Sequence, residues 1–160
     1  MIRGVPRTAW QLGLLGLIPM IWGVAEIYLP FFRSFTEDWL NSWFYAPYAT
    51  LRYAGIILAF MSGVLWGFAA RASGTTATMG YKLAVVPALY SFLFVFGGTQ
   101  DVAIKTAIGF VLVLAIDYLF WRQKMAPDWW MRLRVVLTLV MVACLLAIGM
   151  APDALLSQSR

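Results

Sequence analysis

Histidine is absent from this 160-residue chain, and its one cysteine, Cys144, lies inside an apolar stretch. The chain therefore has no histidine ligand for haem or metal and no histidine general base. A lone cysteine cannot form an internal disulfide and behaves as a small apolar side chain. Because no catalytic motif is recognisable either, we predict that the chain is not an enzyme and carries no cofactor.

Charge is also scarce. Only 12% of the residues are charged, about half the share usual in water-soluble domains, while 62% are apolar and the mean hydropathy is +0.81. A net charge of +5 would suggest nucleic acid as a partner of a soluble protein. Membrane proteins, however, gather Lys and Arg in their cytoplasmic loops. We therefore predict a protein that contacts the lipid bilayer and binds no nucleic acid.

Five apolar stretches are each long enough to cross a bilayer, which takes about 20 helical residues. They leave too little chain for a second folded unit, so residues 1–160 are predicted to form one all-α membrane domain. We expect transmembrane helices at about residues 8–31, 50–70, 79–97, 102–121 and 133–150. The first stretch is too long for a signal-peptide core and is expected to remain as a helix. Pro87 is expected to kink the third helix or to mark a packing gap that a neighbour fills.

The longest connection, at about residues 32–49, is rich in aromatic residues. Thr36, followed by two acids, is typical of a helix N-cap, and Trp39 and Trp43 then share one apolar face. We predict a short helix at about residues 36–45 that lies in the membrane interface, with these tryptophans as anchors. Trp129 and Trp130 are the anchors expected at the opposite interface.

The basic residues are unevenly distributed between the two sides of the membrane. One side, formed by the N-terminus and the second and fourth loops, holds eight of the twelve: Arg3, Arg7, Arg71, Lys82, Arg122, Lys124, Arg132 and Arg134. The other side holds Arg33, Arg52, Lys105 and Arg160. The positive-inside rule thus predicts a cytoplasmic N-terminus and a periplasmic C-terminus in a bacterial inner membrane.

Two acids fall within the predicted spans, where ionisable residues are functional candidates. Asp117 lies near the inner interface, on the same side as Arg132 and Arg134, whose fork-shaped guanidinium groups suit a carboxylate. We interpret Asp117 as part of a structural ion pair, with a proton-relay or ligand role as the alternative. Glu26 lies near the outer interface. It is expected to bond to a Tyr, a Trp N–H or Arg52, or else to form a ligand or proton site.

Small residues recur at every fourth position of the second span: Gly55, Ala59, Gly63 and Gly67. Such a face lets two helix backbones approach closely. With four other helices available in the chain, we expect this face to pack within the bundle, in preference to forming a homodimer.

Several segments together resemble the transmembrane protein 69-like family. They include Val5-Pro6-Arg7-Thr8-Ala9, Ser62-Gly63-Val64-Leu65-Trp66-Gly67, Val86-Pro87-Ala88-Leu89 and Ala126-Pro127-Asp128-Trp129-Trp130-Met131-Arg132-Leu133-Arg134. The resemblance runs from about Val5 to Leu146, and it departs from the family pattern at Ser62 and Leu65, where glycine and a basic residue are expected. It implies a five-helix protein of proteobacterial inner membranes or of mitochondria, with no assigned activity.

These features favour a non-catalytic accessory or assembly subunit that packs against a larger inner-membrane complex, with a bioenergetic complex as the preferred host. The alternative is a small transporter or channel that acts as an oligomer, with Glu26 or Asp117 on the path. A lipid-modifying enzyme would need a reactive group that the sequence does not offer.

Overall fold

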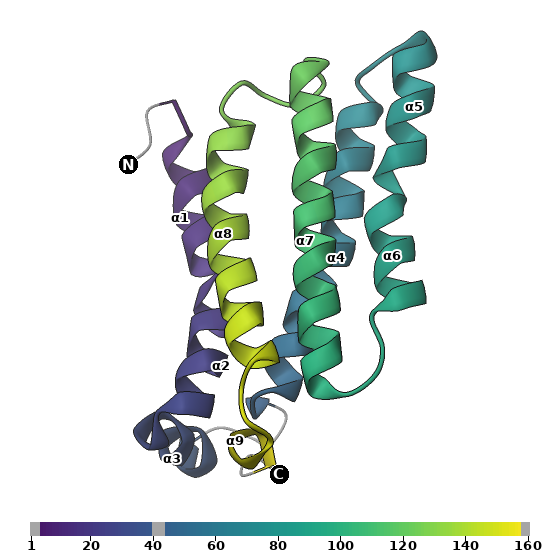
Figure 1. The fold of residues 1–160 in the computed structure, drawn as a ribbon. Helices are drawn as coiled ribbons and strands as arrows, with labels where there is room; N and C mark the ends of the chain where they lie inside the picture. Colours follow the sequence, from purple (N-terminus) through teal and green to yellow (C-terminus); the bar gives the residue numbers. More distant parts are fainter. Residues whose placement is uncertain (1–3, 40–43, 158–160) are drawn as a thin grey trace.

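The computed structural model describes residues 4–39 and 44–157, which form a bundle of helices without any strand (Figure 1). The helices are α1 (Arg7–Leu15), α2 (Ile18–Tyr28), α3 (Pro30–Trp39), α4 (Tyr48–Ala69), α5 (Gly74–Ala84), α6 (Val86–Phe94), α7 (Thr99–Arg122), α8 (Trp130–Gly149) and α9 (Asp153–Ser157). Five helical segments are long and apolar enough to cross a membrane: Arg7–Tyr28, Tyr48–Ala69, Gly74–Phe94, Thr99–Arg122 and Trp130–Gly149. The predicted all-α fold with five spans is confirmed.

The two termini lie at opposite ends of the bundle (Figure 1). The basic end comprises residues 4–6, the α4–α5 turn at residues 70–73 and the α7–α8 turn at residues 123–129. The acidic end comprises α3, the α6–α7 turn at residues 95–98 and α9. Arg71 and Lys124 belong to the basic end, and Glu37, Asp38 and Asp153 to the acidic end.

Pro87 interrupts the third span, as expected, and separates α5 from α6. A proline disrupts the helical hydrogen-bond pattern around it, and neighbouring side chains then satisfy the freed backbone groups. Here the N–H of Ala88 donates to the Ser62 hydroxyl over 2.8 Å. Ser62 belongs to α4, so α4 holds the broken span in place.

Pro19 produces a similar break in the first span, which was expected to be continuous. A turn at Gly16 and Leu17 separates α1 from α2. The Tyr53 hydroxyl of α4 donates to the carbonyl oxygen of Gly16 over 2.7 Å. Both broken spans are therefore bonded to α4 at their breaks.

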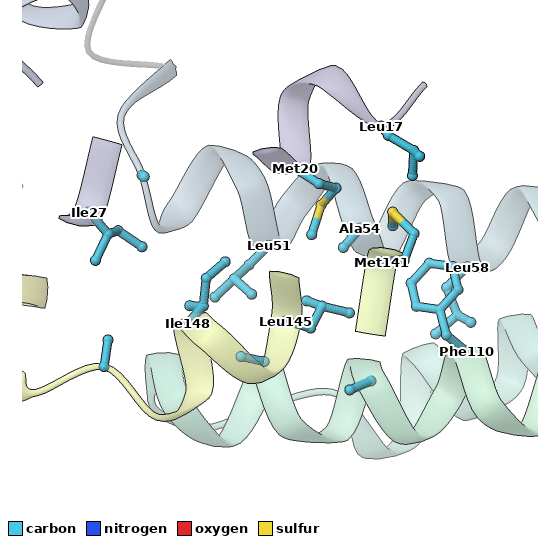
Figure 2. Packing of buried hydrophobic residues seen from close by; sticks show 14 of the residues in the cluster. Leu17, Met20, Ile27, Leu51, Ala54, Leu58, Phe110, Met141, Leu145 and Ile148 are labelled. Carbon is cyan, nitrogen blue, oxygen red and sulfur yellow. The ribbon is translucent and has the colours of Figure 1, made fainter. Parts of the chain in front are cut away.

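The main core lies where α4 packs against α2, α7 and α8. Figure 2 shows Met20 of α2, Leu58 of α4, Phe110 of α7 and Leu145 of α8, all fully buried, among the core side chains. A second cluster, towards the basic end, joins α4, α5, α7 and the α7–α8 turn, and it buries Leu65 completely.

The helices approach most closely at glycines outside the predicted small-residue face. A Cβ on Gly23 would lie 1.8 Å from the Thr50 Oγ1, one on Gly80 would lie 2.9 Å from the Ala69 Cβ, and one on Gly109 would lie 2.7 Å from a methyl group of Leu58. These glycines bring α2, α5 and α7 against α4.

The predicted face of Gly55, Ala59, Gly63 and Gly67 does not pack within the bundle. No described atom of another helix or loop lies within 4 Å of a Cβ placed on any of the three glycines, and Ala59 is exposed. The buried positions of α4 are instead Thr50, Leu51, Ala54, Leu58, Met61, Leu65 and Ala69. The prediction of internal packing was wrong. A span is apolar on all sides, so its pattern does not indicate which face meets the other helices.

The helix predicted at about residues 36–45 begins earlier, because Pro30 starts α3. A residue before proline is disfavoured in helical conformation, and Leu29 is extended with φ −122° and ψ 110°. Proline itself suits the first position of a helix. Thr36 therefore lies within α3 and is not its N-cap, and its hydroxyl donates to the Phe32 carbonyl over 3.0 Å. Trp43 lies outside the described residues.

Candidate functional site

Asp117 of α7 and Arg134 of α8 form a buried ion pair near the basic end. The Arg134 Nε–H donates to Asp117 Oδ2 over 2.6 Å, and the Trp130 Nε1–H donates to Oδ1 over 2.7 Å. The Asp117 side chain is fully buried, and that of Arg134 is 5% exposed. Buried charges persist when they are paired and hydrogen-bonded. This cluster therefore fixes the start of α8 against α7.

Of the two arginines expected near Asp117, the structure brings Arg134 to the carboxylate. Arg132 is exposed, and its Nη1 lies beside Gly4, 3.1 Å from the point that a Cβ added to this glycine would occupy. The Nη2 of Arg134 and the Oγ1 of Thr138 are buried without a hydrogen-bond partner among the described residues. Unsatisfied buried polar atoms are rare in native structures and often mark a bound molecule or a functional role.

A cavity of about 270 Å³ adjoins this cluster, between α1, α4 and α8. Arg134 and Trp130 form part of its wall, and the other lining residues are mainly apolar, including Leu17, Ile57 and Met61. A second cavity of about 570 Å³ lies further along the same seam, between α2 and α4. Tyr53 lines both, so the two cavities adjoin.

Glu26 occupies a separate buried site near the acidic end. Its Oε1 accepts the Ala46 N–H over 3.1 Å, and its Oε2 lies 3.4 Å from the Thr36 hydroxyl. That hydroxyl also accepts the Trp22 Nε1–H over 3.2 Å. Glu26 is 1% exposed. The carboxylate thus joins α2 to α3 and to the segment before α4, and its partners differ from the tyrosine, tryptophan or Arg52 expected from the sequence.

The two buried acids are not brought together. Glu26 lies near the end of α2 at the acidic end, and Asp117 lies near the end of α7 at the basic end. Each carboxylate accepts two bonds or close contacts from its own neighbours. The arrangement gives each acid its own set of partners, in two separate local clusters.

The predicted tryptophan anchors occupy different surroundings. Trp39 is 77% exposed at the end of α3. Trp129 is half-buried, with its ring centroid 5.9 Å from that of Trp130. The Trp130 ring packs edge-to-face on that of Phe68, with 5.0 Å between the ring centroids. Its Nε1–H donates to Asp117. It is therefore an internal partner of the ion pair, although the sequence had suggested an anchor at the membrane interface.

Several partners could not be found from the sequence. The Ala46 N–H is a backbone group and leaves no sequence signal, whereas Thr36 did stand out but was interpreted as a helix cap.

Within residues 4–39 and 44–157, no group of three His, Cys, Asp or Glu side chains lies close enough to hold a metal ion.

Comparisons with known proteins match nearly the whole bundle. The chain is 28% identical over 145 residues to transmembrane protein 69 of Xenopus tropicalis, an alignment that covers 88% of this chain and 53% of that protein. It thus spans about half the length of this relative. No solved structure matches the chain. The family described as protein of unknown function (DUF3429) matches residues 5–150. The chain belongs to this DUF3429 family, which includes the transmembrane protein 69-like proteins.

Proposed function

We propose that this chain is a non-catalytic membrane subunit that binds a transmembrane helix of another protein through the small-residue face of α4. The observation that carries the proposal is the open surface over Gly55, Gly63 and Gly67, where a Cβ would meet no described atom of another helix or loop within 4 Å. A bioenergetic complex of the inner membrane is the host that we expect.

The shape of this face supports a helix as the partner. Small residues let backbones approach closely, and membrane helices associate largely through such packing because lipid supplies no hydrophobic driving force. Ile56, Phe60 and Trp66 are 59%, 62% and 50% exposed and neighbour the small residues along α4. A partner helix would therefore pack on the small residues, with large exposed side chains beside it.

A pair of matched substitutions tests the proposal. Ala59→Leu adds bulk at the small-residue face of α4, whereas Ala115→Leu adds the same bulk to an exposed position of α7. The wild-type chain is tagged and purified after mild solubilisation, and the proteins that remain bound are identified. This experiment gives the wild-type partner. We expect Ala59→Leu to reduce recovery of that partner by at least about tenfold, which corresponds to about 1.4 kcal/mol. The Ala115→Leu variant should retain it.

Other outcomes would contradict this function. Recovery of the chain alone, or only as a homodimer disrupted by Ala59→Leu, would exclude a different protein as the partner. Solute flux through the purified chain in liposomes would favour the transporter alternative. The internal bonding of Glu26 and Asp117 supports the subunit over that alternative.

We also propose that the basic end faces the cytoplasm of a bacterial inner membrane. The support is the gathering of Arg71, Lys124 and the exposed Arg132 at this end, as the positive-inside rule requires. In a Cys144→Ala background, Gln123→Cys should resist a membrane-impermeant maleimide in intact cells, and Asp153→Cys should react. The opposite labelling pattern would reverse the orientation.

A further inference from the structure

We propose that the cavity between α1, α4 and α8 binds one acyl chain of a diacyl phospholipid, and that the ester carbonyl of this chain accepts a hydrogen bond from Arg134 Nη2. This site goes beyond the partner proposed for α4 and shares one residue with it, because Phe60 lines the cavity and also borders the small-residue face.

The first argument for this ligand is an unpaired hydrogen-bond donor of Arg134. Arg134 lines the cavity and is 5% exposed, and its Nη2 has no partner among the described residues. A buried N–H group left unsatisfied is costly, at about 1–3 kcal/mol. Because this nitrogen is buried as well as unpaired, the side chains around it must shift before an acceptor oxygen can reach it and remove that cost.

The charge balance defines the acceptor. Asp117 already neutralises Arg134 at 2.6 Å, so the cluster as a whole carries no net charge. A second carboxylate or a phosphate would bring an uncompensated negative charge into an apolar cavity, which is unfavourable. A neutral carbonyl oxygen has the required acceptor without that charge.

The depth of Arg134 in the membrane fits the position of the ester group of a phospholipid. The 20 residues of α8 span about 30 Å, which matches the hydrocarbon core of a bilayer. Arg134 comes four residues after the start of α8, so its Cα lies about 6 Å inside the hydrocarbon boundary. Helical side chains point back towards the N-terminus, which brings the guanidinium group closer to the level where acyl chains join the glycerol.

The shape of the cavity favours a chain over a compact ring. Leu12 of α1 and Phe60 of α4 line the cavity and are 63% and 62% exposed, so it can be reached sideways from lipid. Through Tyr53 it adjoins the 570 Å³ cavity between α2 and α4. The Tyr53 hydroxyl is bonded to Gly16 and does not compete for the ester. Together the cavities form an elongated, mainly apolar path along one seam, with Arg52 in the wall of the larger cavity.

The test compares two lipids on the wild-type protein, so that folding is not in question. The full-length chain is delipidated in detergent and then exposed to a diester phosphatidylcholine or to its diether analogue, which has the same chains and headgroup but no ester carbonyl. Native mass spectrometry counts the lipids retained. We expect one tightly held diester lipid, with the diether analogue binding about tenfold more weakly.

Two matched variants locate the site. Leu12→Trp narrows the mouth of the cavity and should weaken diester binding several-fold. Leu139→Trp changes a residue of α8 that is also 63% exposed and should leave binding unchanged. Equal binding of diester and diether lipids would overturn the proposal, as would equal binding by both variants. Co-purification of a quinone in place of phospholipid would also overturn it.

Discussion

Replacing Asp117 with asparagine tests the buried ion pair directly. Asparagine keeps the shape of the side chain and an acceptor oxygen, but it leaves the Arg134 cation, 5% exposed, without its counter-charge. Removing one member of a buried pair costs about 3–5 kcal/mol. At about 1.4 kcal/mol per tenfold change, the unfolding equilibrium constant should rise by roughly a hundredfold to a few thousandfold.

The free energy of unfolding can be measured by titrating SDS into mixed micelles and following the helical signal by circular dichroism. The matched control is Asp128→Asn, which removes an exposed carboxylate from the neighbouring α7–α8 turn. Surface changes of this kind usually alter stability by no more than about 0.5 kcal/mol. The two variants lose the same charge, so their difference isolates burial and pairing.

A double variant separates pairing from packing. In Asp117→Asn with Arg134→Gln, neither side chain is charged, so no unpaired ion stays buried. Replacing both members of a buried pair by neutral residues is often close to neutral in stability. The double variant should therefore be more stable than Asp117→Asn alone, with a favourable coupling between the two positions of about 2 kcal/mol or more.

Two results would refute this reasoning. If Asp117→Asn unfolded within about 0.5 kcal/mol of the wild type, the carboxylate charge would not support the fold. If the stability lost in the double variant equalled the sum of the losses in the two single variants, the coupling would be zero and the side chains would stabilise the fold through separate contacts. Normal stability with loss of a measurable activity would instead restore the proton-relay or ligand role of Asp117.

Three further predictions use the same titration. Gly23→Ala places a Cβ 1.8 Å from the Thr50 Oγ1 and should destabilise by about 1–3 kcal/mol or more, whereas Gly55→Ala should be neutral or stabilise by up to about 1 kcal/mol; equal effects would contradict the packing. Tyr53→Phe leaves the carbonyl at the α1–α2 break without its donor and should cost about 0.5–2 kcal/mol. Ser62→Ala should cost a similar amount by removing the acceptor at the α5–α6 break; no loss in either variant would show that the break is stabilised in another way.

The sequence predicted the spans well because span length and hydropathy follow from the thickness of the bilayer. It also indicated that Asp117 would meet a basic residue, since a buried carboxylate requires a partner. The choice of Arg134 over Arg132 depends on the rotation of α8. That rotation is set by packing, and α8 is apolar on nearly all sides.

The missed features are those in which one helix satisfies the backbone of another. Pro19 is as clear in the sequence as Pro87, yet its effect depends on whether a donor lies opposite the freed carbonyl. Tyr53 is 37 residues away from Gly16, and nothing in the local pattern links them. The same holds for the bond from the Ala46 N–H to Glu26, because backbone groups are present at every residue.

The bonds at the two helix breaks also limit how α4 can turn. Tyr53 and Ser62 hold α4 to the first and third spans through bonds of 2.7 Å and 2.8 Å. Rotating α4 to bury its small-residue face would break both bonds and move Leu58 out of the core. Each broken bond would leave a backbone group unsatisfied in an apolar setting, which is costly. The open face of α4 is therefore a fixed feature of the described bundle, which leaves Gly63 available to the helix that we propose as its partner.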